Sequence, residues 1–111
     1  MDNGRFDVLE SFLKIPLESA DGVFETFMEI PGHIFRGEGQ QRFLYIRGRR
    51  NNKVCLVAHG DTEWDIHNGY QPFPGREIGF NGDGFFSTTE GCGLGADDRA
   101  GCAILWILRD L

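Results

Sequence analysis

The strongest constraint on the fold is an apolar run, residues 53–58, that leads directly into His59 and Asp61. A short apolar run between turn-forming segments predicts a buried strand. A second segment places Asp97 and Asp98 at the start of a stretch whose apolar residues recur at helical spacing. A buried strand that ends in polar side chains, together with a helix that begins with acids, predicts an α/β fold with a polar site between them.

Hydrophobic spacing predicts the remaining elements. Apolar residues recur at helical spacing in two amino-terminal segments, which Pro16 and Pro31 end. A chain of 111 residues fits one domain, because domains commonly have ~100–150 residues. We predict a single domain, residues 1–111, in which helices flank a mixed β-sheet. The predicted elements are helices at 5–15, at 23–30 and from 96 or 97 to the end, strands at 43–47 and 53–58 joined as a hairpin, a hairpin of 77–80 with 85–88, and loops at 63–76 and 90–95.

Charge and hydropathy exclude several classes of partner. The formal net charge is -6 and the sequence pI is about 4.9, which disfavours binding to phosphate backbones and anionic lipid. The basic cluster from Arg47 to Lys53 is short and contains no aromatic residue, so it is interpreted as a solvated turn. No apolar run approaches the ~18–20 residues of a membrane span, and the first residues lack the features of a signal peptide. We predict a cytoplasmic protein without nucleic-acid or membrane partners.

The three cysteines predict reduced thiols. Their odd count and the absence of a Cys-x-x-Cys spacing indicate neither a disulfide framework nor a structural zinc site. Cys55 and Cys102 lie in apolar segments and are expected to act as small buried hydrophobic residues. Cys92 lies in the Gly-rich loop next to the predicted polar site.

The residue types around the predicted site suit a metal ion. Side chains two apart in a strand point to the same side, so His59 and Asp61 can converge at its carboxyl end. A neutral imidazole is a ligand for zinc, and a carboxylate two residues on can accept the other ring N–H and fix its orientation. Asp97 and Asp98 repel each other unless a cation lies nearby. A carboxylate there could also bridge two metals about 3.5–4 Å apart.

These motifs resemble a known family. Residues 57–62 followed by residues 95–101 are similar to the co-catalytic di-zinc exopeptidases, which include tripeptidase-T-like, carboxypeptidase-like and glutamyl-aminopeptidase-like enzymes. The resemblance implies a phosphorylase/hydrolase-like zinc exopeptidase fold and a peptide or small amide substrate cleaved by a water that zinc activates. It also implies that His59 ligates one zinc ion, that Asp61 orients His59, and that Asp97 bridges two zinc ions.

The sequence also departs from this family. Its members use a Glu as general base, a further carboxylate ligand and a late His, all of which follow the acidic pair. After that pair the only acid here is Asp110, and no His follows. We therefore expect the chain to be the amino-terminal part of such an enzyme, with an incomplete site. Asp98 and Arg99 match the flanking motif, but the resemblance gives them no role, and it leaves the oligomeric state, a homo-oligomer included, open.

Two further functions remain open. The Gly91–Ala96 segment loosely follows the glycine spacing of dinucleotide-binding loops, although Asp97 and Asp98 would repel a pyrophosphate docked on that helix. The chain could also be a non-catalytic metal-binding or interaction module derived from the peptidase fold.

Other polar segments have simpler interpretations. Residues 81–84 hint at a calcium loop, but Phe85 occupies the next ligand position, so a hairpin turn is preferred. His33 and His67 have no partner at metal-ligand spacing and are interpreted as loop residues. The segment that contains His67 does, however, leave from Asp61.

Overall fold

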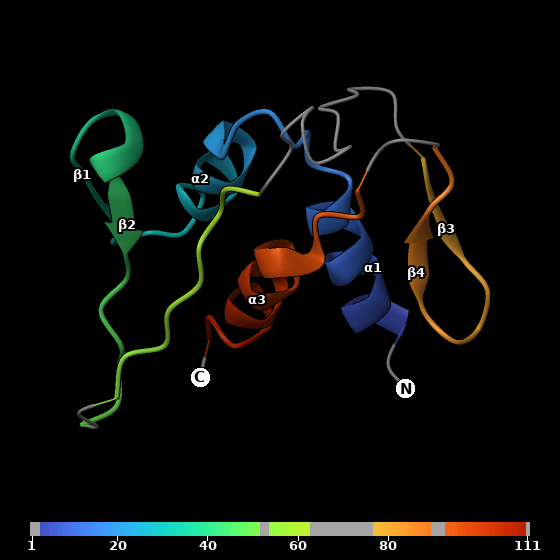
Figure 1. Ribbon diagram of the computed structural model, residues 1–111. Coiled ribbons are helices and arrows are strands. Elements are labelled where there is room, and N and C mark those ends of the chain that lie inside the picture. Colours follow the sequence, from blue (N-terminus) through green and yellow to red (C-terminus); the bar gives the residue numbers. More distant parts are fainter. Residues whose placement is uncertain (1–2, 52–53, 63–76, 90–92, 111) are drawn as a thin grey trace.

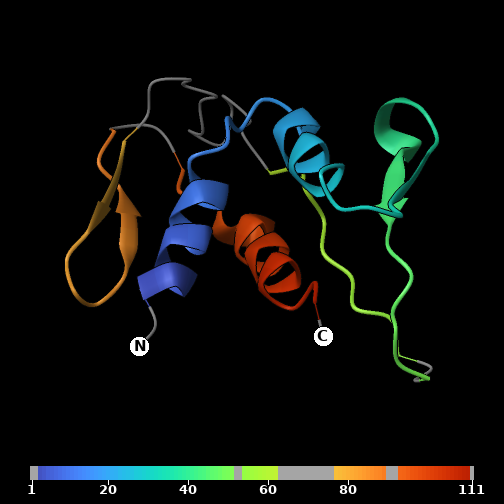
Figure 2. The ribbon, with the colours of Figure 1, turned by 180° about the vertical axis from the view of Figure 1, so that it is seen from behind.

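The computed structural model describes residues 3–51, 54–62, 77–89 and 93–110 (Figure 1). These residues form three α-helices and two separate two-stranded antiparallel sheets, so the predicted α/β class is confirmed. The helices lie in the centre, and one sheet lies on either side of them (Figures 1 and 2). The predicted single mixed sheet is not what the described strands form.

Helices α1 (Asn3–Leu13) and α3 (Ala96–Ile107) pack side by side and form the centre of the fold. The first predicted helix is confirmed, and it ends at Leu13 because Pro16 disfavours helical backbone at the residue before it. The apolar stripe of α1 meets the buried face of α3. The buried cluster at this contact contains Phe12, Val23, Cys102 and Ala103.

Helix α2 (Asp21–Phe27) begins two residues earlier than predicted. The Ser19 hydroxyl oxygen accepts a hydrogen bond from the Asp21 amide at 3.0 Å, which satisfies one of the free amides at a helix start. Phe24 packs edge-on against Phe35, with ring centroids 5.3 Å apart. Helix α2 is thereby attached to the first sheet.

The first sheet corrects the predicted strand pairing. Strand β2 (Phe43–Tyr45) pairs with β1 (Ile34–Arg36), and a 3-10 helix, Gly39–Gln41, lies between them. Strand β1 has only three residues, too few to reveal a hydrophobic period. The predicted pairing of 43–47 with 53–58 is therefore wrong: β2 pairs with β1 alone in a two-stranded sheet, and the described residues 54–58 belong to no strand.

The apolar run before His59 is also not buried. Residues 54–58 are extended, but the structure assigns them to no strand. Val54, Leu56 and Val57 are 74%, 59% and 82% exposed, and Cys55 is exposed as well. The expected buried strand and the expected burial of Cys55 are wrong for this structure, because an apolar strand is buried only where other segments cover both its faces.

The second predicted hairpin is confirmed. Strands β3 (Ile78–Phe80) and β4 (Phe85–Ser87) pair antiparallel. In the turn, the Asn81 side-chain oxygen accepts hydrogen bonds from the amides of Asp83 at 2.9 Å and Gly84 at 3.2 Å. Gly82 has a φ of 92°, which favours glycine. These bonds support the hairpin interpretation of residues 81–84 over a calcium loop.

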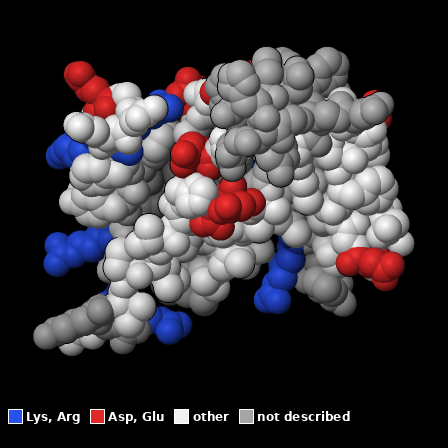
Figure 3. Space-filling model, viewed as in Figure 1, with Lys and Arg blue, Asp and Glu red and all other residues white. Residues whose placement is uncertain are grey.

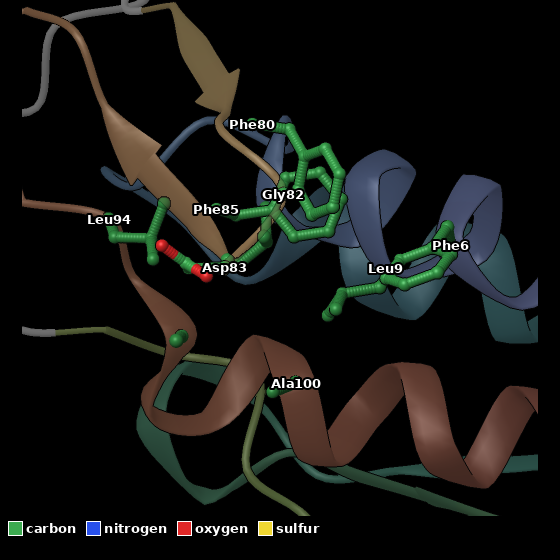
Figure 4. Close-up of a pocket in the computed structure, with 11 residues that line it drawn as sticks. Phe6, Leu9, Phe80, Gly82, Asp83, Phe85, Leu94 and Ala100 are labelled. Atoms are coloured by element: carbon green, nitrogen blue, oxygen red, sulfur yellow. The ribbon is translucent and has the colours of Figure 1, made fainter. Parts of the chain in front are cut away.

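An apolar cavity of about 310 Å³ lies between this hairpin, α1 and the start of α3 (Figure 4). Its walls include the rings of Phe6, Phe80 and Phe85, and Phe6 lies 5.4 Å from Phe80 between ring centroids. Among the described residues that line it, Asp83 is the only ionisable one. The cavity contains none of the predicted metal ligands.

Several predictions made from the sequence concern residues that the structure does not describe. The loop at 63–76, with His67, and the first part of the Gly-rich loop, with Cys92, are not among the described residues. Within the described ranges, no helix has both the length and the apolar character needed to cross a membrane.

Candidate metal centre

His59 lies at the centre of the candidate site, with a carboxylate on each side of its ring. Its Nε2 atom is 3.0 Å from Asp97 Oδ1, although the two residues are 38 positions apart in the chain. Its Nδ1 atom is 2.9 Å from the Asp61 carbonyl oxygen and 3.1 Å from Asp61 Oδ1. Both acids that the sequence predicted to accompany His59 are therefore in contact with its ring.

The first turns of α3 hold the backbone that carries His59. The His59 amide donates to Asp98 Oδ2 at 3.4 Å, and its carbonyl oxygen accepts from the Cys102 thiol at 3.2 Å. The next carbonyl oxygen, of Gly60, accepts from Arg99 Nε at 2.7 Å. Helix α3 therefore both supplies Asp97 and fixes the segment that carries its partner.

The Cys102 thiol is kept protonated and able to donate. Burial and, to a lesser extent, the negative charge of Asp98 raise its pKa to about 11, although the Arg99 charge acts in the opposite direction. The expected burial of Cys102 is confirmed at 2% exposure. A protonated thiol is a weak donor, so Cys102 contributes mainly by packing against the segment.

The two adjacent acids have different roles. Asp97 and Asp98 lie within the bounds of α3 but have non-helical backbone angles, and the peptide bond between them is cis. Asp97 directs its carboxylate to the His59 ring and is 96% exposed. Asp98 instead accepts the amides of His59 and Gly101, the latter at 3.1 Å. Asp98 is therefore a cap of the regular helix, and only Asp97 is available as a ligand.

The two carboxylates and one carbonyl affect the charge of His59. Partial burial is the largest single influence and lowers the pKa of His59, but the Asp61 carbonyl and the carboxylates of Asp97 and Asp61 together raise it above 6.5. The side chain of His59 is 54% exposed, and that of Asp61 is 84% exposed. The ring therefore binds its second proton more readily than a free imidazole, and that proton lies between Nε2 and Asp97.

The donor geometry fits part of a zinc site. Two ligands of a tetrahedral zinc ion, each about 2.0–2.1 Å from the metal, are about 3.3 Å apart. The 3.0 Å between His59 Nε2 and Asp97 Oδ1 is within a few tenths of an ångström of that value. Among the described residues, no group of three or more His, Cys, Asp or Glu side chains could hold a metal ion. The described part of the chain thus brings together two candidate metal donors, His59 Nε2 and Asp97 Oδ1, with the Asp61 carboxylate beside Nδ1 of His59.

The surface around the site is acidic. Acidic side chains gather near the centre of the face in Figure 3, over the region where α3 begins beneath the segment of residues 58–61. Negative charge at this position would attract a cation. The other described histidine, His33, lies elsewhere and its Nδ1 contacts the Ile30 carbonyl oxygen at 2.9 Å.

Sequence reasoning found His59, Asp61 and Asp97 but assigned no role to Asp98 or Arg99. For Asp98, the available signal is its residue type, because an aspartate at a helix start often accepts the backbone amide three residues on, which here belongs to Gly101. For Arg99, the signal is a charged residue on the same helix face as the buried Cys102 and Ala103.

Comparison with known proteins assigns the chain to no family: no family model, no curated protein and no solved structure matches it.

The raised pKa of His59 can be measured in the metal-free protein. We expect the NMR titration of its ring protons to have a midpoint above 6.5, and Asp97→Asn to lower that midpoint. Because the pKa of His59 is higher in the folded state, protonation of its ring stabilises the fold. This stabilisation is complete below the unfolded-state pKa and is lost as the pH rises through the folded-state pKa. An Asp97→Asn variant with the same midpoint as the wild type would show that the Asp97 carboxylate does not act on the ring in solution.

Proposed function

We propose that this chain carries part of the metal centre of a zinc-dependent hydrolase that acts on terminal peptide bonds or related amides. The observation that supports the proposal best is the 3.0 Å approach of His59 Nε2 to Asp97 Oδ1. A zinc ion would replace the proton between these two atoms, and it would relieve the negative charge around them. Zinc in such a site supplies an activated water and a positive charge for the scissile carbonyl.

Each residue has a separate task in this proposal. His59 would hold zinc through Nε2, and Asp61 would accept the Nδ1 proton, which fixes the tautomer and raises the basicity of the ligand nitrogen. Asp97 would supply a carboxylate oxygen, Oδ1, while its Oδ2 atom makes no hydrogen bond within the described part of the chain. A second zinc ion would add to the charge available for activating a water. The general base, a Glu by analogy with the exopeptidases, and the remaining ligands would come from outside the described residues.

The proposal extends to the fold. Residues 54–58 are extended, apolar and largely exposed, which suits a strand of a larger mixed sheet flanked by helices, as in zinc exopeptidases. His59 and Asp61 would then follow the carboxyl end of that strand, where open α/β sheets place their ligands.

A non-catalytic metal-binding module is the second candidate. It is favoured by the lack of a third metal donor among the residues that the structure describes. A nucleotide-binding role for the Gly91–Ala96 loop is less well supported. Asp98 already accepts the Gly101 amide at the start of α3, and its charge would repel a phosphate there.

Zinc titration and peptidase assays on the full-length, metal-stripped protein test the proposal. We expect zinc binding by calorimetry, and we expect added zinc to restore the hydrolysis of peptides with a free terminus. Peptides blocked at both ends should remain intact. Zinc binding without hydrolysis would favour the non-catalytic module. Failure to bind zinc, combined with thermal stabilisation by a dinucleotide, would reject the metal centre.

A further inference from the structure

Arg99 is the buried charged side chain of the described core, with 0% exposure. Its guanidinium group donates hydrogen bonds to backbone carbonyl oxygens from two distant parts of the chain. Burial of a charge is costly unless strong dipoles replace the lost water. Four of its acceptors lie among the described residues: Gly60 at 2.7 Å, Ile15 at 3.0 Å, Pro16 at 3.1 Å and Ser19 at 3.2 Å.

These contacts join three segments. Three of the acceptors lie in the connection between α1 and α2, and the fourth lies between His59 and Asp61. Arg99 itself lies on α3, two residues after Asp97. One side chain therefore links the helix that supplies one proposed metal ligand to the segment that supplies the other.

Gly60 leaves little space for a side chain. A Cβ atom on Gly60 would lie 3.2 Å from Val23 Cγ1 and 3.4 Å from Ala20 Cβ, at the start of α2. The first of these distances is tighter than nearly all real Cβ contacts, so a substitution there would require Val23 or the Gly60 backbone to move. The Gly60 carbonyl that Arg99 binds therefore lies on a backbone close to the start of α2.

We propose that Arg99 is a positioning residue for the His59–Asp97 pair, and this inference rests on the proposed function. Arg99 donates to the Gly60 carbonyl oxygen at 2.7 Å, next to His59, and it would act on the pair by holding that carbonyl relative to α3. Ligand pairs must keep their separation to within about 0.5 Å to bind a metal well. Loss of a supporting partner outside the coordination sphere typically weakens metal binding 10–100-fold.

Arg99→Lys in the full-length protein is the decisive variant. Lysine keeps the charge and the alkyl chain, but its single ammonium group lacks the planar fork that reaches several carbonyl oxygens at once. We expect zinc affinity, measured by calorimetry, to fall about 10–100-fold. We also expect the visible spectrum of the cobalt-substituted protein to change, because the ligand geometry changes.

A stability control separates positioning from general destabilisation. Phe85→Leu alters a half-buried ring that packs against Phe6 and Phe80 at the second hairpin, away from Arg99 and its carbonyl acceptors. We expect it to lower the melting temperature while zinc affinity and the cobalt spectrum stay as in the wild type. Arg99→Ala should weaken zinc binding at least as much as Arg99→Lys.

The outcomes distinguish this inference from the function on which it rests. If zinc binding depends on His59 but Arg99→Lys binds zinc as tightly as the wild type, the positioning role is wrong and the metal centre stands. If zinc binding does not depend on His59, both the positioning role and the metal centre are wrong.

If neither Arg99 variant folds, Gly60→Ala tests the same link from the Gly60 side. Its new Cβ atom would lie too close to Val23, and the resulting shift of the backbone would move the Gly60 carbonyl relative to Arg99. Unchanged zinc affinity in that variant would overturn the inference, and a 10–100-fold loss would support it.

Discussion

His59→Ala in the full-length protein is expected to weaken zinc binding by more than about 100-fold, beyond the 10–100-fold typical of residues outside the coordination sphere. The ring supplies Nε2, which lies 3.0 Å from Asp97 Oδ1, and alanine offers no donor in its place. Calorimetric titration of the metal-stripped protein measures the loss. A metal site with one ligand removed does not recover that donor from the solvent at equal affinity, because water is a weaker donor to zinc than an imidazole nitrogen and is not held in place by the protein.

The matched control is His33→Gln. His33 is partly buried and its Nδ1 contacts the Ile30 carbonyl oxygen, without a neighbouring carboxylate in the hydrogen bonds of the described residues. Zinc affinity in this variant should equal that of the wild type. Equal losses in the two variants would mean that zinc binds histidines nonspecifically.

A graded pair of variants separates ligand from orienting residue. Asp97→Asn removes a charged ligand and should weaken zinc binding about as strongly as His59→Ala. Asp61→Asn keeps an acceptor for His59 Nδ1, which lies 3.1 Å from Asp61 Oδ1, and should cost only about 10–100-fold. If Asp61→Asn is the more damaging change, the roles given to the two acids are reversed.

Gly101→Ala is expected to destabilise the fold by about 1–3 kcal/mol, the usual cost of overpacking a well-packed site. Glycine within a helix is normally about 0.5–1 kcal/mol less favourable than alanine, so helix propensity alone predicts the opposite sign. The reason is the carboxylate of Asp98: a Cβ atom on Gly101 would lie 2.6 Å from Asp98 Cγ and closer still to Asp98 Oδ1. Chemical denaturation of both proteins measures the difference.

A double-mutant cycle identifies the cause. Displacement of Asp98 would also break its hydrogen bonds to the amides of Gly101 and His59. In an Asp98→Ala background the clash is absent, so Gly101→Ala should be neutral or should stabilise by about 0.5–1 kcal/mol. If Gly101→Ala costs the same in both backgrounds, contact with Asp98 is not the reason for the glycine.

The helices and the 78–87 hairpin were predictable because their signals are local. Pro16 ends the first helix through its own ring, and Asn81 and Gly82 specify a turn within four residues. The failed prediction at residues 54–58 shows the limit of such signals. An apolar run predicts burial, but the burial itself depends on which other segments lie beside it.

By itself, the sequence determined that His59 and Asp61 belong together, because two residues of spacing on extended backbone bring their side chains to one side. It also identified Asp97 as an acid at the start of a helix. Only the tertiary structure decided that Asp97 contacts His59 Nε2, because 38 residues of intervening chain leave that distance open to any packing. It also decided that Asp98 is a cap and that Arg99 is buried among carbonyl groups, since the partners of both residues come from distant segments.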